Sequence, residues 1–233
     1  MNFAIILSGG IGSRMGLNIP KQYVEVNGKL ILSYCLETFI SCNIIDTIII
    51  GVSEEWHEFV KQKVSLLNAH KPIYYTTPGE TRQYSIYNAL KTIKEIGGQA
   101  EDIVIIHDAA RPLVSSQLIS NCIKSCQNAD GVLPVIPVKD TIYFSKDGNQ
   151  IDDLLNRSCL WAGQAPEAFH FGKYIKAHEE MDRNELLKIN GSTEIAVKAG
   201  MKCQMIEGDP MNFKITTSED LINFENITKN NKS

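Results

Sequence analysis

Short apolar runs that alternate with amphipathic segments constrain the fold of this chain more than any other feature. The runs are rich in Ile and Val and lie at residues 3–7, 47–52, 73–76, 103–106 and 131–136. Because they lack polar alternation, they are typical of strands covered on both faces, as in a parallel sheet between two helical layers. The crossover helices are predicted at residues 31–41, 55–67, 85–96 and 116–128. The sequence therefore predicts an α/β fold with a doubly wound, mostly parallel sheet that binds ligands at the carboxyl ends of its strands.

The length and composition of the chain fit one globular domain. It has 233 residues, of which 43% are hydrophobic and 21% charged, enough to bury a continuous core. We therefore expect residues 1–233 to form a single domain. The formal net charge of -4 offers no broad basic surface for DNA or RNA. Nucleic acid is not an expected partner, and an anionic ligand must be held by a few basic residues gathered in one place.

Cysteine usage and the N-terminal sequence indicate a reducing, cytoplasmic setting. The six cysteines include no C-x-x-C pair, so we expect buried thiols, with a metal site a remote second. Residues 1–7 lack the basic start of a signal peptide and give way to glycines. No run approaches the roughly 18 apolar residues of a membrane span. The protein is therefore predicted to be cytoplasmic and to have no membrane contact.

One segment interrupts the alternation of strands and helices. Residues 141–145, then Lys146-Asp147-Gly148-Asn149, then residue 150 onward predict a β-hairpin, because Asp-Gly or Gly-Asn favours the positive φ angles of a tight turn. A hairpin that projects from an α/β domain often contacts another subunit. We therefore expect a dimerisation arm at about residues 138–160 and a homodimer.

Glycines follow the first apolar run directly. The segment reads Ser8-Gly9-Gly10-Ile11-Gly12-Ser13-Arg14-Met15-Gly16, followed by Pro20-Lys21-Gln22. Without Cβ atoms, glycine amides can approach a phosphate closely, and Arg14 and Lys21 would supply the positive charge. The competing interpretation is a plain strand-to-helix turn.

Two common phosphate-binding motifs are absent from this sequence. The pattern G-x-x-x-x-G-K-[ST] fails because Gly28-Lys29 is followed by Leu30. The pattern G-x-G-x-x-G fails because residue 15, counted from Gly10 and Gly12, is Met15. A reductase that uses NAD(P) is therefore only a distant alternative.

The glycine loop resembles the signature loop of the cytidylyltransferases that include methylerythritol-4-phosphate and ribitol-5-phosphate cytidylyltransferase. The resemblance extends over most of the chain, from residue 4 to about residue 222. The further matching blocks, in chain order, are Gly79-Glu80-x-Arg82-x-x-Ser85, His107-Asp108-Ala109-Ala110-Arg111-Pro112, Pro137-Val138-x-Asp140-Thr141, Asn156-Arg157, Gln164-x-Pro166 and Asn212-x-Lys214-Ile215-Thr216. The joint order and spacing of these blocks are far more specific than any one of them.

The resemblance implies a reaction in which a phosphomonoester oxygen attacks the α-phosphorus of CTP and pyrophosphate leaves. The nucleophile is already ionised at neutral pH, so the chemistry requires no dedicated general base. It requires cations that align two mutually repelling anions and neutralise the charge of the transferring group. The implied small-molecule partners are CTP and a phosphorylated polyol, with Mg²⁺ as the cofactor that neutralises the triphosphate.

The functional residues of the family can be carried over onto the matching positions. The resemblance implies catalytic cations at Arg14, Lys21, Arg157 and Lys214. It implies nucleotide contacts from Ser8, Gly9, Gly10, Gly12, Gly79, Glu80, Ser85 and Ala109. It implies acceptor recognition by Asp108, Arg111 and Thr141, with Thr141 reaching the neighbouring subunit's substrate and Asp108 also a candidate Mg²⁺ ligand.

Each of these residues also has an ordinary structural interpretation. The block at residues 79–85 is a possible capped helix start, and Asp108 a possible helix cap. Lone Arg and Lys residues are usually solvated, and a β-branched residue such as Thr141 is common in strands. A lone histidine at a strand end is more often structural, so His107 is assigned no proton-transfer role.

The sequence departs from the family on the acceptor side. Gln164-Ala165-Pro166-Glu167 stands where the family usually has Gln-Thr-Pro-Gln, which removes a hydroxyl and adds a negative charge. Gly163-Gln164 and Asn156-Arg157 are more similar to the ribitol branch, whereas residues 107–112 are more similar to the methylerythritol branch. Residues 191–194 differ from both. The leading hypothesis is a ribitol-5-phosphate type of acceptor, with methylerythritol phosphate as the alternative. A catalytically silent regulator is disfavoured because all four catalytic cations are present.

Overall fold

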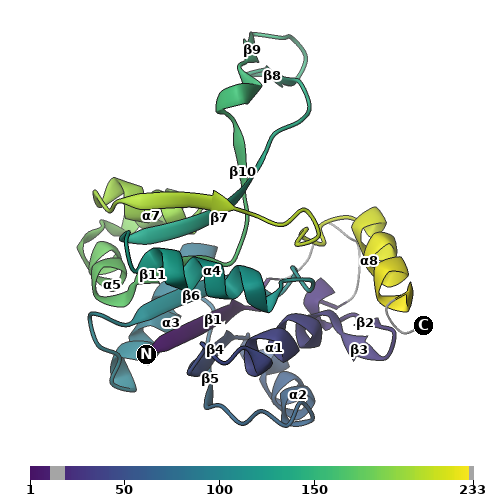
Figure 1. The fold of residues 1–233 in the computed structure, drawn as a ribbon, viewed down its shortest axis with the longest axis vertical. Coiled ribbons are helices and arrows are strands. Elements are labelled where there is room, and N and C mark those ends of the chain that lie inside the picture. Colours follow the sequence, from purple (N-terminus) through teal and green to yellow (C-terminus); the bar gives the residue numbers. More distant parts are fainter. Residues whose placement is uncertain (11–18, 231–233) are drawn as a thin grey trace.

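A mixed eight-stranded sheet forms the centre of the protein (Figure 1). The computed structural model describes residues 1–10 and 19–230. Along the sheet the strand order is β10-β7-β11-β6-β1-β4-β5. Strand β12 is outside this order and pairs in parallel with β7. The strands are β1 (Asn2–Leu7), β4 (Thr47–Gly51), β5 (Ile73–Thr76), β6 (Ile103–Asp108), β7 (Gly131–Pro137), β10 (Trp161–Gly163), β11 (Glu167–His170) and β12 (Cys203–Glu207).

The predicted α/β fold with a mostly parallel sheet is confirmed, and the five predicted strands and four predicted crossover helices are all present. The sheet also holds antiparallel strands that the sequence analysis did not identify, since β11 runs against β6 and β7, and β10 runs against β7. The helices of the described segments are α1 (Ile31–Ser41), α2 (Glu54–Ser65), α3 (Arg82–Glu95), α4 (Ser116–Cys126), α5 (Phe171–Glu180), α6 (Arg183–Lys188), α7 (Ser192–Lys198) and α8 (Ser218–Asn230).

Alternate residues of the central strands bury into opposite faces of the sheet. Ala4 and Ile6 of β1 belong to a core cluster with residues of α1, α2 and α4. Phe3 and Ile5 belong to a second cluster with residues of α3 and α5. Because both faces are covered, these strands need apolar residues at every position, which explains the continuous apolar runs in the sequence.

A hairpin arm extends away from the body at the top of Figure 1. It contains β8 (Ile142–Phe144) paired antiparallel with β9 (Asp153–Leu155), followed by a short 3-10 helix at Arg157–Cys159. At its tip, Asp147 Oδ1 accepts hydrogen bonds from the amides of Asn149 and Gln150, and Gly148 has a φ of 77°. The predicted hairpin is therefore present, and its role as a dimerisation arm stays a prediction.

A small hairpin and the C-terminal helix form a third packing unit. The hairpin of β2 (Glu25–Val26) and β3 (Lys29–Leu30) turns at Asn27 and Gly28, whose φ angles are 50° and 82°. Val26 packs in one cluster with Phe224 of α8 and Ile215. This unit holds the segment at residues 212–216, in which the carbonyl oxygen of Ile215 accepts a hydrogen bond from Lys21 Nζ.

The cysteine prediction is correct in part. All six cysteines are free thiols, and Cys35, Cys42, Cys122 and Cys126 are buried, whereas Cys203 is half-buried and Cys159 lies exposed on the arm. Burial raises the pKa of Cys35 to about 12. Among the described helices, none has both the length and the apolar character needed to cross a membrane.

Candidate active site

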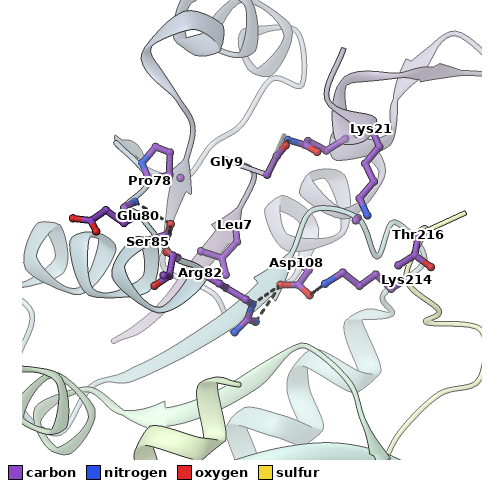
Figure 2. A pocket seen from close by; sticks show the side chains of 16 residues that line it. Leu7, Gly9, Lys21, Pro78, Glu80, Arg82, Ser85, Asp108, Lys214 and Thr216 are labelled. Atoms are coloured by element: carbon purple, nitrogen blue, oxygen red, sulfur yellow. Dashed lines mark hydrogen bonds and ion pairs between the residues drawn. The ribbon is translucent and has the colours of Figure 1, made fainter. Parts of the chain in front are cut away.

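A cavity of about 500 Å³ opens at the carboxyl ends of β1, β4 and β6 (Figure 2). Its lining comes from segments far apart in the chain: Gly9 and Gly10 after β1, Lys21 and Gln22, Pro78 to Arg82 with Ser85, Asp108 at the end of β6, and Lys214 with Thr216. This is the edge of the sheet at which the sequence predicts ligand binding.

The start of the glycine loop is held by hydrogen bonds from the side chain of Gln22. Gln22 Nε2 donates to the carbonyl oxygens of Ser8 and Gly10, at 2.7 and 2.8 Å. A Cβ on Gly9 would lie only 2.6 Å from Cβ of Pro78, whereas a Cβ on Gly10 would meet no heavy atom of residues 1–10 or 19–230 within 4 Å. Gly9 is therefore required by packing, and Gly10 faces open space in the cavity.

The opposite rim of the cavity is the start of α3. Ser85 Oγ accepts a hydrogen bond from the amide of Gly79 at 3.0 Å and donates to Thr81 O at 2.9 Å. A Cβ on Gly79 would lie 2.3 Å from Cβ of Tyr84. The structural interpretation of this block as a capped helix start is thus correct, and the same residues line the cavity.

Lys21 and Lys214 reach the cavity from one side, through a shared segment. Lys21 Nζ donates to the carbonyl oxygen of Ile215 at 2.7 Å, although the two residues are 194 positions apart. Lys214 Nζ donates to Asp108 Oδ2 at 2.8 Å. The segment at residues 212–216 therefore holds the ammonium group of Lys21 and supplies that of Lys214, which Asp108 holds.

Arg82 completes an ion-pair chain with Asp108 and Lys214, marked by dashed lines in Figure 2. Arg82 Nε and Nη2 both lie 3.1 Å from Asp108 Oδ1, and Nη1 donates to Ser192 Oγ at 2.6 Å. Although burial opposes ionisation, the charges of Arg82 and Lys214 hold the pKa of Asp108 well below its usual range. Burial also disfavours the charged form of Arg82, but the negative charges of Asp108 and Glu167 nevertheless raise its pKa. Asp108 and Arg82 are therefore both charged at neutral pH.

A second cavity, of about 290 Å³, adjoins the first at this ion-pair chain, because Arg82, Asp108 and Lys214 line both cavities. Arg111 and Glu167 are its further charged side chains. Arg111 Nη1 donates to Asn212 O at 2.7 Å. Burial lowers the pKa of the Arg111 guanidinium against the opposing pull of Asp108 and Glu167. Two adjoining cavities, each reached by cations, thus meet at Arg82, Asp108 and Lys214.

His107 is buried and has the structural role that the sequence analysis favoured. It is 0% exposed, and its Nε2 lies 2.9 Å from the carbonyl oxygen of Arg111. Burial lowers its pKa to about 4. The ring is therefore neutral and enclosed, and it supports the backbone of residues 107–111 rather than facing a substrate.

The structure brings together most of the residues predicted for the site. Gly9, Gly10, Lys21, Gly79, Glu80, Ser85, Asp108 and Lys214 line the larger cavity, and Arg111 lines the smaller one. Gly12 and Arg14 lie outside the described residues.

Other predicted residues lie elsewhere. Ser8 is 1% exposed, with its hydroxyl 3.1 Å from that of Tyr23, and Ala109 is also 1% exposed, so neither side chain lines a cavity. Arg157 and Thr141 are on the arm, in neither cavity, and Arg157 Nη1 donates to Lys139 O at 2.9 Å. Within one chain these two residues are therefore not part of the cation cluster.

Sequence reasoning did not assign a role to Arg82 or to Thr193. Arg82 was visible only as one letter of the block at residues 79–85, and its burial against Asp108 depends on the pairing of β1 with β6. Thr193 lies in the segment at residues 191–194 that matched neither branch, yet its amide and hydroxyl both donate to Glu167. No local sequence pattern predicts these contacts, because the partners are distant in the chain.

Asp108, the predicted metal ligand, is already held by cationic side chains. Its Oδ1 accepts hydrogen bonds from Arg82 and its Oδ2 from Lys214. Over residues 1–10 and 19–230, no group of three or more His, Cys, Asp or Glu side chains is placed to hold a metal ion. The role of Asp108 as a metal ligand stays a prediction.

Comparison with known proteins decides the family. The family model described as 2-C-methyl-D-erythritol 4-phosphate cytidylyltransferase (IspD) matches residues 2–230. The chain belongs to this family. The chain is 38% identical to the 2-C-methyl-D-erythritol 4-phosphate cytidylyltransferase of Clostridium beijerinckii over 227 residues, 97% of this chain and 98% of the relative.

Solved structures agree with this assignment. The crystal structure of the Francisella tularensis 2-C-methyl-D-erythritol 4-phosphate cytidylyltransferase is 30% identical, with a TM-score of 0.80 over 96% of this chain and 99% of the other. The 4-diphosphocytidyl-2C-methyl-D-erythritol synthase of Anaerococcus prevotii is 26% identical, with a TM-score of 0.82 over 99% of this chain and 96% of the other.

Membership confirms the predicted family and the predicted class of enzyme, a CTP-dependent cytidylyltransferase. An NAD(P)-dependent reductase and a silent regulator are thereby set aside. The names of these relatives favour the methylerythritol alternative over the ribitol hypothesis that led the sequence analysis.

Proposed function

We propose that this protein transfers CMP from CTP to 2-C-methyl-D-erythritol 4-phosphate and releases pyrophosphate. The observation that carries the proposal is the pair of adjoining cavities that share Arg82, Asp108 and Lys214. A nucleotide and a phosphorylated acceptor can each occupy one cavity with their reacting groups at the shared boundary. The relatives that span the whole chain carry this acceptor in their names.

The cations at the boundary suit the proposed chemistry. An oxygen of the acceptor phosphate forms a bond to the α-phosphorus of CTP as the bond from that phosphorus to the β-phosphate bridging oxygen breaks, and pyrophosphate carries away the electron pair. Lys21 and Lys214 lie where this charge develops, and fixed positive groups stabilise such a transition state. The two anions repel each other, so holding them in line removes much of the barrier.

The larger cavity is proposed to take CTP. The open amide region at Gly9 and Gly10, together with Lys21, suits the triphosphate. The rim formed by Gly79, Glu80 and Ser85 is proposed to contact the cytidine. Gly12 and Arg14 are proposed, from the family resemblance alone, to complete the phosphate contacts. A divalent cation carried by the triphosphate would neutralise its charge.

A second copy of the chain is proposed to complete the acceptor cavity. The arm exposes large apolar side chains, at 57% for Tyr143, 68% for Ile151 and 56% for Leu154, which an isolated chain would leave in water. Arg157 and Thr141 lie on this arm and face neither cavity of their own chain. We therefore propose a homodimer in which the arm of one subunit brings these residues to the acceptor cavity of the other.

Pyrophosphate release tests the proposed reaction. The protein is incubated with Mg²⁺, each of the four nucleoside triphosphates, and either 2-C-methyl-D-erythritol 4-phosphate or ribitol 5-phosphate. We expect release with CTP and the methylerythritol phosphate. Release with ribitol 5-phosphate alone overturns the proposed acceptor, and release with another triphosphate overturns the proposed nucleotide.

Mixing two inactive variants tests the proposed dimer. Arg157→Ala and Lys214→Ala are each expected to be inactive alone. If Arg157 acts across the interface, each mixed dimer holds one site without either substitution, and an equal mixture regains about a quarter of the wild-type activity. No recovery from a mixture that sedimentation shows to contain mixed dimers contradicts the proposal.

A further inference from the structure

Glu167 is a buried carboxylate in the acceptor cavity to which neither the sequence nor the family match assigns a role. It is 7% exposed and begins β11, where it pairs in register with Ile106 of β6, two residues before Asp108. The side chain lines the smaller cavity but not the larger one. A buried carboxylate is costly unless each oxygen has partners, so its presence at this wall needs an explanation.

One oxygen of Glu167 is fully engaged by the protein. Oε2 accepts hydrogen bonds from the amide of Thr193 at 3.0 Å and from its hydroxyl at 2.6 Å. These two bonds come from the first turn of α7 and fix the plane of the carboxylate. The orientation of the group is therefore set before any ligand arrives.

The other oxygen lacks a hydrogen-bond donor among residues 1–10 and 19–230. Oε1 lies 3.7 Å from Arg82 Nη2, too far for a hydrogen bond. Arg82 itself is turned elsewhere, since Nε and Nη2 bond Asp108 and Nη1 bonds Ser192. Oε1 is thus an acceptor oxygen in a fixed position that can take a further hydrogen bond, on the wall of a cavity whose other charged side chains are Asp108 and the cations Arg82, Arg111 and Lys214.

We propose that Glu167 is a specificity-determining residue that accepts a hydrogen bond through Oε1 from a hydroxyl on the carbon chain of the acceptor. A carboxylate is an acceptor only, so it needs a donor, and a polyol phosphate offers hydroxyl groups while its phosphate occupies the cations. A site built to bond a hydroxyl strongly disfavours an analogue that lacks it. This inference rests on the proposed function, because it assumes a polyol phosphate in the smaller cavity.

The test is a cycle that combines variants with deoxy substrates. The kcat/KM of the wild-type protein and of Glu167→Gln is measured with 2-C-methyl-D-erythritol 4-phosphate and with analogues that lack one hydroxyl at carbon 1, 2 or 3. Glutamine keeps the shape, but with its oxygen on Thr193 it places an N–H donor where Oε1 accepts, so the charge-assisted bond from the hydroxyl is lost. Glu207→Gln, an exposed residue at the end of β12, is the control.

For the wild type we expect one of the three analogues to lose roughly 10- to 100-fold in kcat/KM, the usual value of a hydrogen bond to a charged group. Glu167→Gln should lose a similar factor with the intact acceptor and nothing further with that same analogue. The KM for CTP should stay unchanged. A Glu167→Gln protein that still discriminates among the analogues as the wild type does, or that loses CTP binding equally, overturns the proposal.

Two further measurements separate the causes of failure. Thr193→Val, which removes one of the two donors to Oε2, should raise the KM for the acceptor severalfold with kcat little changed, and circular dichroism checks that each variant is folded. If the wild type uses ribitol 5-phosphate instead, the proposed acceptor is wrong, and the same cycle with deoxyribitol phosphates decides the role of Glu167.

Discussion

The two cavities meet at Arg82, Asp108 and Lys214 but are built in different ways. The larger one is lined mainly by loops that directly follow strands, with backbone and small residues such as Gly9, Gly10 and Gly79 at its wall. The smaller one adds Arg111 and Glu167 to the three shared charged side chains, and Glu167 is oriented by hydrogen bonds from Thr193.

This difference has a physical consequence. Main-chain amides at fixed positions suit the phosphates of any nucleoside triphosphate, because they contact groups common to all of them. Ion pairs and oriented carboxylates depend on the exact donor offered by the ligand, and unmatched groups in a buried site cost free energy. We therefore expect the larger cavity to supply binding and the smaller one to supply selectivity among acceptors.

The largest expected effect is the loss of Lys21. Lys21→Ala should lower kcat by about 10²- to 10³-fold, the usual loss when one fixed group that stabilises the transition state is removed. Thermal unfolding should change little because the side chain is only half-buried and lies at the start of a short 3-10 helix, Lys21–Tyr23. Lys29→Ala, which removes an exposed lysine paired with Glu37, is the control. An unchanged kcat for Lys21→Ala excludes the residue from the mechanism.

Substitution of Arg111, which lines only the smaller cavity, tests whether the two cavities bind different substrates. Arg111→Met should raise the KM for the acceptor roughly 10- to 100-fold, the value of a lost hydrogen bond between charged groups, and leave the KM for CTP unchanged. Steady-state kinetics with each substrate varied in turn measures both constants. Lys176→Met, an exposed pair with Glu180, is the control. A parallel rise in both KM values contradicts the division of labour between the cavities.

Acidic pH should lower the stability of the folded protein through His178, whose contacts lie near the smaller cavity. His178 Nε2 accepts from Gln83 Nε2 at 2.6 Å, and Tyr174 donates to Ser192 O, beside the Ser192 hydroxyl that Arg82 contacts. Burial lowers the pKa of His178 from 6.5 to about 4. Between these values the unfolded chain binds a proton that the folded protein does not, so stability is full above about pH 6.5 and falls as the pH drops toward 4.

Denaturation by urea measures this pH dependence. His178 should account for about 2 kcal/mol of the stability lost between pH 7 and pH 5. His178→Gln should show that much less loss over the same interval, and exposed His70→Gln should behave as the wild type. Equal pH dependence in all three proteins shows that His178 titrates normally.

The smallest expected effect distinguishes two glycines of the larger cavity. Gly79→Ala should reduce the free energy of unfolding by at least about 1 kcal/mol, because its Cβ would lie 2.3 Å from Cβ of Tyr84. Gly10→Ala should leave stability unchanged, since no heavy atom in the described part of the chain would lie within 4 Å of the added Cβ, and should instead raise the KM for CTP. Thermal unfolding and CTP kinetics measure the two effects. Equal stabilities contradict the packing role of Gly79.

The sequence alone determined five strands of the sheet, four of its covering helices and the edge where ligands bind. Continuous apolar runs can be satisfied only by strands buried on both faces, and glycines after the first strand mark a close backbone approach. These signals are local, whereas Gly79, Glu80, Ser85 and Lys214 of the larger cavity were predicted through the family resemblance.

Only the tertiary structure decided which charges meet. Asp108 was predicted as a metal ligand, but it is held by Arg82 and Lys214, which are 26 and 106 positions away in the chain. Glu167 is oriented by Thr193, 26 positions away. Arg157 and Thr141, predicted in the site, lie on an arm that reaches neither cavity of its own chain. Ion pairing depends on distance in space, and the sequence fixes that distance only after the sheet has brought its strands together.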